Sequence, residues 1–268
     1  MKPAHYVIRG GEQGFERLRV LARVMQPVTE SLLDRVGVAK GMSCLDVGCG
    51  GGQVTCELAR RVGPEGKALG LDIDETKLSL ARYEAGKRGL TNAEFRKTDI
   101  RAAGGNQDYD LLYSRFLLTH LNDPGRVVDH MRTHLRLGGV MVLEDIDFSG
   151  YFTYPPSPSF RRYHQLYTAA VRRRGGDPDI GPRLPMLLAA AGFESVQIHI
   201  AQPMGFQGEV KLINPITMEN IADVVLDEGL ASQGEIDYIV RQLYEIADMP
   251  NTIAGMPRVV QAWGYRGA

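Results

Sequence analysis

The segment from Cys44 to Val54 constrains the fold most, because it joins an apolar strand, an acidic residue and a glycine-rich turn. It reads Cys-Leu-Asp-Val-Gly-Cys-Gly-Gly-Gly-Gln-Val. Glycine lets the backbone turn tightly and approach a ligand closely, since it has no Cβ. A glycine run alone is weak evidence. Its position between a predicted strand and a predicted helix indicates a ligand-binding turn of an α/β sheet.

This turn suits a ligand without phosphate better than it suits a nucleotide. A dinucleotide site needs a third glycine for close helix packing, and Gln53 occupies that position. A P-loop needs Lys followed by Ser or Thr after the glycines, and no such pair follows here. Asp46 would repel a pyrophosphate but attract an ammonium group, so an amino-acid moiety would fit. The alternative, that Asp46 merely caps the turn, stays open.

Apolar runs and helical segments alternate after the glycine turn, which predicts an α/β fold with a parallel sheet covered on both faces. The predicted strands are Ser43–Val47, Ala68–Asp72, Ala93–Lys97, Leu111–Ser114, Val140–Asp145, Ser195–Ile200 and Arg258–Tyr265. The predicted helices between the first five are Gln53–Arg61, Glu75–Arg88 and Pro124–Leu135. Gly138 and Gly139 are interpreted as the stop of the third helix before the next strand.

Segments outside this alternation predict helical additions to the sheet. Residues 1–40 form a predicted N-terminal helical cap segment, with an amphipathic pattern from Gly14 to Val36 that Pro27 should divide into two helices. Residues 41–268 form the predicted main domain. It carries lid insertions at about 151–180 and 205–249, of which the second reads as two helices.

Acidic residues follow the second and third predicted strands. Asp72 lies roughly 20 residues past the turn, where Rossmann-like folds hydrogen-bond ribose hydroxyls. Asp74 is interpreted as the cap of the next helix. Asp99 could accept a hydrogen bond from an adenine amino group, and Ile73 and Ile100 could pack against the adenine faces. Asp72 could also be a plain strand-end acid, and Asp99 a solvated loop acid.

Several segments together resemble the successive motifs of class I S-adenosylmethionine-dependent methyltransferases, especially small-molecule enzymes of the ubiquinone/menaquinone-biosynthesis type. These segments are Leu45–Gly52, Leu69–Asp72, Thr98–Asp99, Tyr109–Ser114 and Leu137–Val142. The resemblance implies a Rossmann-like, seven-stranded, mostly parallel sheet whose last strand is antiparallel, with helices on both faces and helical cap insertions. S-adenosylmethionine would lie across the carboxyl ends of the first strands, and a small-molecule substrate would enter beneath the cap.

The resemblance also implies a set of cofactor contacts. Gly48, Gly50 and Gly52 would adjoin the methionine and ribose portions, and the acids and isoleucines at the two strand ends would take the roles just described. Ser114 and Arg115 would flank the methionine portion. The fourth strand ends without the Asn/Asp-Pro-Pro-aromatic motif of amino-methylating nucleic-acid enzymes, which disfavours that subclass.

Candidate catalytic residues are less well defined. A hydroxyl or carbon acceptor would need a base, and Glu144 and His120 are the candidates, with Asp145 and His164 behind them. Each could instead be structural: His120 could be a hydrogen-bonded histidine at the start of a helix, and Glu144 could only orient a loop. Tyr6 could close over the cofactor or simply pack.

One aromatic helix face leaves a further choice open. Its residues either line an acceptor pocket or anchor the helix on the core. They are Phe160, Tyr163, Tyr167 and Val171.

Composition narrows the function classes. A net charge of −1 and a pI near 6.6 disfavour a nucleic-acid partner, which would need a basic face. No stretch is long and apolar enough for a membrane helix. The three cysteines lack metal-ligand spacing and are interpreted as reduced thiols of a cytoplasmic protein, with no metal site. A non-catalytic cofactor-binding protein, a tRNA- or protein-directed methyltransferase and, less favoured, a nicotinamide oxidoreductase stay open, as do the acceptor and the oligomeric state.

Overall fold

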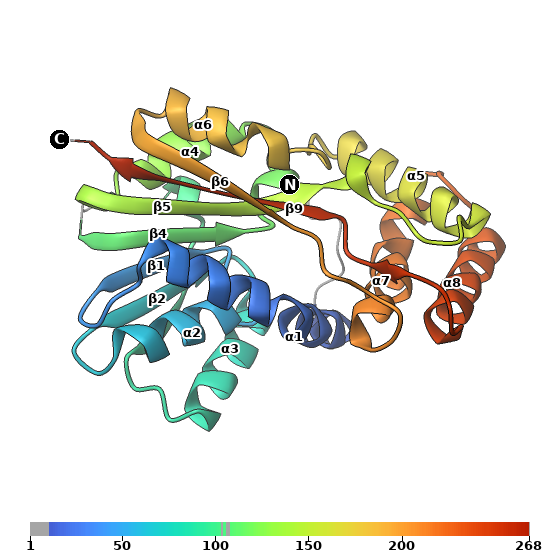
Figure 1. The fold of residues 1–268 in the computed structure, drawn as a ribbon, viewed down its shortest axis with the longest axis horizontal. Coiled ribbons are helices and arrows are strands. Elements are labelled where there is room, and N and C mark those ends of the chain that lie inside the picture. Colours follow the sequence, from blue (N-terminus) through green and yellow to red (C-terminus); the bar gives the residue numbers. More distant parts are fainter. Residues whose placement is uncertain (1–10, 103, 106–107, 268) are drawn as a thin grey trace.

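A seven-stranded sheet forms the centre of the molecule (Figure 1). The computed structural model describes residues 11–102, 104–105 and 108–267. The strand order is β3-β2-β1-β4-β5-β9-β6, and β9 runs antiparallel to both of its neighbours while the pairs among β1 to β5 are parallel. The strands are β1 (Ser43–Val47), β2 (Lys67–Asp72), β3 (Ala93–Lys97), β4 (Tyr109–Arg115), β5 (Leu135–Asp147), β6 (Phe193–Ala201) and β9 (Arg258–Arg266). The predicted fold class is confirmed.

Helices cover both faces of this sheet, as the alternating pattern predicts. The first face packs on α1 (Gly11–Val36), α2 (Gln53–Val62) and α3 (Glu75–Lys87), and the second on α4 (Pro124–Arg132) and α6 (Leu184–Ala190). Buried β4 residues alternate between the two faces: Leu111 and Tyr113 pack on the first, Leu112 on the second. This period of two is the geometry of a strand. Short 3-10 turns, η1 (Ile100–Ala102), η2 (Leu118–His120), η3 (Phe148–Gly150), η4 (Gly181–Arg183) and η5 (Glu209–Leu212), lie in the connections.

Three further helices form a cap beside the sheet, to the right in Figure 1. They are α5 (Pro158–Arg173), α7 (Ile213–Asp227) and α8 (Gln233–Asp248), and their buried faces share one apolar cluster with Phe148 and Tyr151. A two-stranded sheet of β7 (Met204–Gly205) and β8 (Ala254–Gly255) stands at the base of α7 and α8, and the sequence did not predict it. The division of the chain at residue 40 stays a prediction.

A buried lysine joins the two chain segments that enter and leave the α7–α8 pair. Lys211 is 1% exposed, and its ammonium group donates to the carbonyls of Phe206 and Met249 and to the hydroxyl of Thr252. Burial lowers the pKa of Lys211. Three oxygen acceptors satisfy the three donors of an ammonium group. Lys211 therefore holds the segment that precedes α7 and the segment that follows α8 at one point.

Two local predictions are wrong. Pro27 lies inside the single helix α1 and does not divide it. Buried apolar side chains precede and follow the proline, among them Met25 and Leu32, and their packing offsets a penalty of about 3 kcal/mol for proline in a helix. Gly138 and Gly139 do not stop a helix either. Helix α4 already ends at Arg132, and the glycines lie within β5.

Gly52 has a packing role that predicts a measurable cost for Gly52→Ala. Its φ is +77°, and an added Cβ would stand 2.6 Å from the Ala81 Cβ and 2.7 Å from the Phe95 ring. We expect the free energy of unfolding, measured with urea, to fall by about 2–4 kcal/mol. The matched control is Gly86→Ala, since an added Cβ meets nothing there within α3, and it should stabilise by up to about 1 kcal/mol. Equal effects of the two substitutions would contradict this packing role.

Candidate functional site

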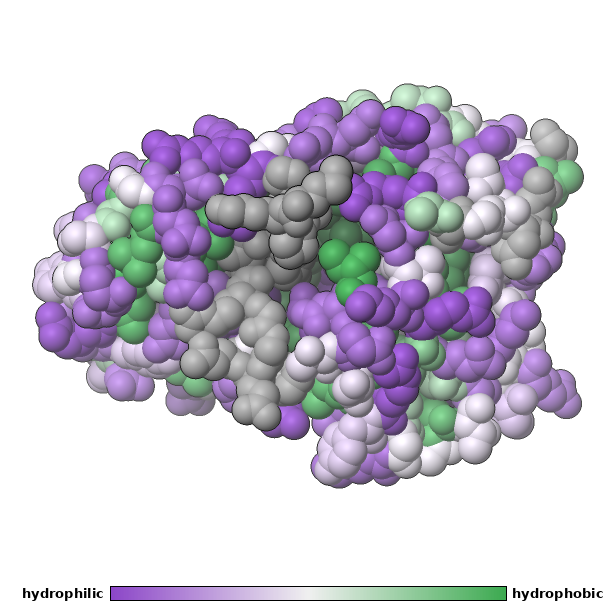
Figure 2. All heavy atoms as spheres, turned by 180° about the vertical axis from the view of Figure 1, so that it is seen from behind, coloured by the Kyte–Doolittle hydropathy of each residue, from purple (hydrophilic) through white to green (hydrophobic). Residues whose placement is uncertain are grey.

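One continuous cavity of about 660 Å³ opens at the carboxyl ends of the parallel strands and extends beneath the cap. In the space-filling view from behind, hydrophobic atoms lie in a hollow near the middle of the molecule, next to hydrophilic side chains (Figure 2). We call its two parts the cofactor half and the cap half. The cofactor half is lined by residues 46–51, 71–74, 98–101, Arg115 and Leu117. The cap half is lined by Arg17, Thr119, His120, Ile146, Phe148, Tyr151, Tyr163, Tyr167, Ile213, Thr217, Met256 and Pro257.

The glycine turn is held in shape by backbone hydrogen bonds and by one carboxylate. Gly48 and Gly50 have φ values of +76° and +51°, in the left-handed region that favours glycine. The Gly48 N–H donates to the Leu71 carbonyl at 2.8 Å, and the Gly50 N–H donates to Asp72 at 2.9 Å. The other Asp72 oxygen accepts from the Asp74 N–H at 2.9 Å. Asp72 therefore lines the cavity and also orders the turn.

Asp46 is a buried carboxylate in the wall of the cofactor half. It is 2% exposed and accepts a hydrogen bond from the Thr55 hydroxyl at 2.6 Å. Burial raises the pKa of Asp46 to about 6, against the lowering effects of Thr55 and of the Arg115 charge. A buried carboxylate next to a cavity favours a cationic ligand group, because an ammonium would offset the cost of burying its charge.

The far end of the cofactor half carries the residues predicted for adenine. Ile100 is buried and Ile73 is half exposed, and both line the cavity together with Asp99. Arg101 pairs with Asp99 through several hydrogen bonds, which lower the pKa of that carboxyl. An adenine amino group would therefore share Asp99 with this guanidinium.

Two predicted cofactor residues, Gly52 and Ser114, do not line the cavity. Gly52 packs against Ala81 and Phe95. Ser114 is buried and donates to the Val47 carbonyl at 3.0 Å, so it joins β4 to β1. Tyr6 lies outside the described residues.

The candidate bases differ in whether their side chains line the cavity. Glu144 is buried within the sheet, where it accepts hydrogen bonds from the Tyr113 hydroxyl and from Gln261, and it does not line the cavity. Asp145 accepts from the Thr119 N–H at 3.1 Å and also lies outside the lining. Burial raises its pKa to about 7. His120 does line the cavity, but burial and the charges of Arg17 and Lys77 lower its pKa to about 3.

The cap half brings Tyr163, which the sequence analysis singled out, together with Arg17, Tyr151 and Thr217, which it did not assign to the site. Arg17 on α1 donates from Nε to the Thr217 hydroxyl on α7 at 3.2 Å. Tyr151 donates to the Gly255 carbonyl at 2.7 Å, and Tyr163 interacts with the hydroxyls of both Tyr151 and Thr217. No sequence motif marks this group, because its members come from α1, the β5–α5 connection, α5 and α7.

The aromatic face predicted on α5 divides in the structure. Tyr163 and Tyr167 line the cavity, whereas Phe160 packs edge-on against Tyr151 in the cap cluster. Val171 is buried in the same cluster. The α5 face thus takes both roles that the sequence left open.

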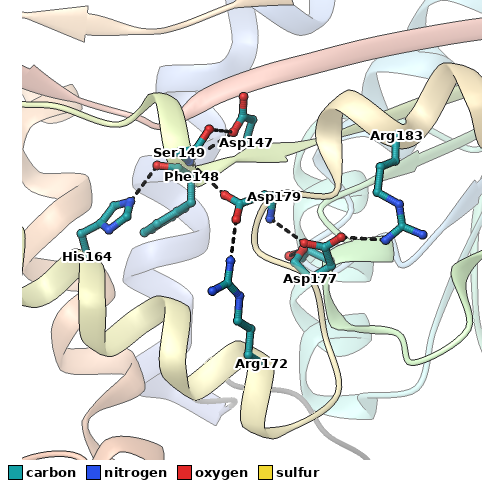
Figure 3. Close-up of polar contacts among 9 residues, drawn as sticks. Asp147, Phe148, Ser149, His164, Arg172, Asp177, Asp179 and Arg183 are labelled. Carbon is teal, nitrogen blue, oxygen red and sulfur yellow. Dashed lines mark hydrogen bonds and ion pairs between the residues drawn. The ribbon is translucent and has the colours of Figure 1, made fainter.

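Phe148 is fixed in the cavity wall from two sides (Figure 3). Its carbonyl contacts Nε2 of His164 on α5 at 2.8 Å, and its N–H donates to the Pro178 carbonyl. The next residue, Ser149, donates its N–H to Asp179, which also binds Arg172. The Phe148 ring stacks on Tyr167 with centroids 4.1 Å apart. His164 is therefore placed to position an aromatic wall of the cap half.

Comparison with protein families agrees with this geometry. Residues 39–169 match the family model described as a methyltransferase domain, and this range contains the glycine turn, Asp72 and Asp99. We refer to this matched range as the methyltransferase domain. The sequence-based resemblance to class I S-adenosylmethionine-dependent methyltransferases is thus confirmed for this domain.

Curated relatives of the methyltransferase domain match over part of their length. The chain is 38% identical over 100 residues to a trans-aconitate 2-methyltransferase of Deinococcus radiodurans, which covers 37% of this chain and 36% of that protein. It is 30% identical over 116 residues to a ubiquinone biosynthesis O-methyltransferase of Acinetobacter baumannii, which covers 42% of this chain and 48% of that protein. The chain thus spans less than half the length of either relative.

A solved structure shows the same fold over nearly the whole chain. It is phosphoethanolamine N-methyltransferase 2 of Haemonchus contortus in complex with S-adenosyl-L-methionine, at a TM-score of 0.60 and 16% identity. The match covers 96% of this chain and 59% of that chain. The likeness extends beyond the methyltransferase domain into the cap helices.

The raised pKa of Asp46 predicts a pH-dependent gain in stability for Asp46→Asn. A buried carboxyl whose folded-state pKa lies above its unfolded value lowers the stability as the pH rises past the unfolded value, and the loss is complete above about pH 6. We expect the variant to be more stable than wild type by up to about 3 kcal/mol near neutral pH. The gain should shrink as the pH falls from about 6 towards 4. Urea unfolding across this range measures it, and a gain independent of pH would contradict the assignment.

Proposed function

We propose that the chain transfers a methyl group from S-adenosylmethionine to a small-molecule acceptor held in the cap half. The observation that carries the proposal is the single cavity that joins the glycine turn of a methyltransferase domain to a separate chamber beneath the cap. The curated relatives named above, which act on trans-aconitate and in ubiquinone biosynthesis by their names, support a small molecule as the acceptor.

The cofactor half offers groups that suit each part of this cofactor. Asp46 would bind the ammonium of the methionine portion, and Arg115, whose charge acts on Asp46, would bind its carboxylate. Asp72 would accept from the ribose hydroxyls while it holds the turn. Ile73 and Ile100 would pack against the adenine, and Asp99 would accept from its amino group.

Methyl transfer requires mainly that the acceptor atom be aligned with the methyl group of the cofactor. When bound, S-adenosylmethionine supplies a methyl group on a positively charged sulfur. That methyl group would go to a lone pair of the acceptor, and the electrons of the sulfur–carbon bond would remain on sulfur. The chain's own residues would position the acceptor in line with that bond and exclude water, which can supply several kcal/mol of the barrier. A neutral hydroxyl or carbon acceptor would also lose a proton, and His120, which is neutral at physiological pH, is the predicted base that lines the cavity.

A non-catalytic cofactor-binding protein is the second candidate. The observation that favours it is the position of Glu144 and Asp145, both tied into the sheet away from the cavity lining. Methyl transfer from labelled S-adenosylmethionine to any acceptor would exclude this candidate.

The cellular location and the kind of partner are also part of the proposal. Cys44, Cys49 and Cys56 are free thiols, which supports a cytoplasmic protein because reduced cysteines are usual there. The net charge of −1 supports a small molecule over nucleic acid as partner. Within the described residues, none of the helices combines the length and apolar composition of a membrane span.

Asp72→Ala tests the cofactor site. The variant loses the ribose acceptor and both backbone contacts of the turn, so we expect the affinity for S-adenosylhomocysteine in calorimetry to fall by about 100-fold. The matched control is Glu94→Ala, an exposed acid on β3 whose replacement should leave the affinity unchanged. Unchanged binding by the Asp72 variant, or no binding by the wild type, would overturn the proposed function.

A further inference from the structure

The two halves of the cavity differ in charge. Carboxylates line the cofactor half, namely Asp46, Asp72, Asp74 and Asp99. The cap-half residues named above include no carboxylate and one cation, Arg17, while the charge of Lys77, elsewhere in the cavity lining, also acts on His120. The acidic half therefore suits the cationic groups of the cofactor, whereas the electrostatics of the cap half favour a neutral or anionic molecule.

The guanidinium groups of Arg115 and Arg17 act on different halves of the cavity. The charge of Arg115 acts on Asp46, in the cofactor half. The charge of Arg17 acts on His120 and on Tyr151 and Tyr163, all in the cap half. Arg17 is thus the guanidinium that an acceptor in the cap half would meet.

A chain of hydroxyl groups holds the Arg17 guanidinium in place. Its Nε donates to Thr217, Tyr163 interacts with Thr217 and with Tyr151, and Tyr151 donates to the Gly255 carbonyl. Among the described residues, Thr217 is the hydrogen-bond partner of Arg17. A guanidinium whose plane is fixed at Nε can pair through its two terminal nitrogens with the two oxygens of a carboxylate.

The rest of the cap half is apolar. Ile146, Phe148, Ile213 and Met256 line it, and Phe148, whose carbonyl contacts His164 in Figure 3, stacks on Tyr167. Such a chamber would hold a hydrocarbon or aromatic body. A dianion such as a phosphate monoester would bring a second negative charge, and Lys77, the other cation that acts on His120, is already paired with Asp74 at 3.9 Å.

We propose that the acceptor is a carboxylic acid with an apolar body, whose carboxylate pairs with Arg17 beside Thr217 and Tyr163. The apolar body lies against Phe148, Ile146 and Met256. Arg17 is a specificity-determining residue in this assignment, because the matching amide or amine would leave its charge without an anionic partner. The assignment rests on the proposed function, since it concerns the acceptor of the same cavity.

Binding to the protein loaded with S-adenosylhomocysteine tests the assignment. The probes are cinnamate and octanoate, each compared with its amide and its amine of the same skeleton. We expect at least one acid to bind about 10-fold or more tightly than its amide in calorimetry, and the amine to bind least. Arg17→Gln should abolish the preference for the acid. Arg19→Gln, an exposed arginine two residues along α1, should keep it.

The outcomes separate this assignment from the proposed function. Failure of the wild type to bind S-adenosylhomocysteine would remove both. Normal binding of S-adenosylhomocysteine with equal responses to acids, amides and amines, including no response at millimolar concentration, would overturn the carboxylate assignment alone. An Arg17→Gln variant that loses S-adenosylhomocysteine as strongly as the acid would also overturn it, because Arg17 would then be a cofactor ligand.

Discussion

The hydrogen bond from the Gly50 N–H to Asp72 is the contact on which the rest of the site depends. It joins the turn after β1 to the end of β2, so two neighbouring parallel strands define one rigid corner of the cavity. The same carboxylate accepts from the Asp74 N–H, and Asp74 caps α3. A single side chain thereby fixes the turn, the strand end and the start of the next helix. The cofactor half is preorganised by backbone geometry, which local sequence dictates.

This locality explains how much of the molecule the sequence could predict. The sequence predicted the first three strands to within one residue, and Gly50 does bind Asp72, because strand, turn and helix follow one another along the chain. The small sheet of β7 and β8 escaped prediction, since two-residue strands carry no periodic pattern. The prediction of a helix break at Pro27 was wrong, because it rested on the local propensity of proline, which the burial of α1 overrides.

The cap half was harder to predict for a physical reason. Arg17 and Thr217 lie 200 residues apart in sequence, and neither belongs to a motif with fixed spacing. Glu144 shows the converse case. A carboxylate near the end of a predicted strand suggests a catalytic role. The Glu144 side chain instead points into the sheet, where it accepts hydrogen bonds from Tyr113 and Gln261. Which side of a strand end faces the cavity depends on tertiary packing that a single sequence does not reveal.

Lys211 has a consequence for how this scaffold could vary among relatives. The ammonium group holds the carbonyls of Phe206 and Met249 together, so the chain leaves the sheet region and returns to it through almost the same place. Insertions and deletions between these two points would leave the strands and the glycine turn undisturbed. Evolution could therefore exchange the helices between them as a cassette, and adapt the chamber to a new acceptor without rebuilding the scaffold that holds the methyl donor.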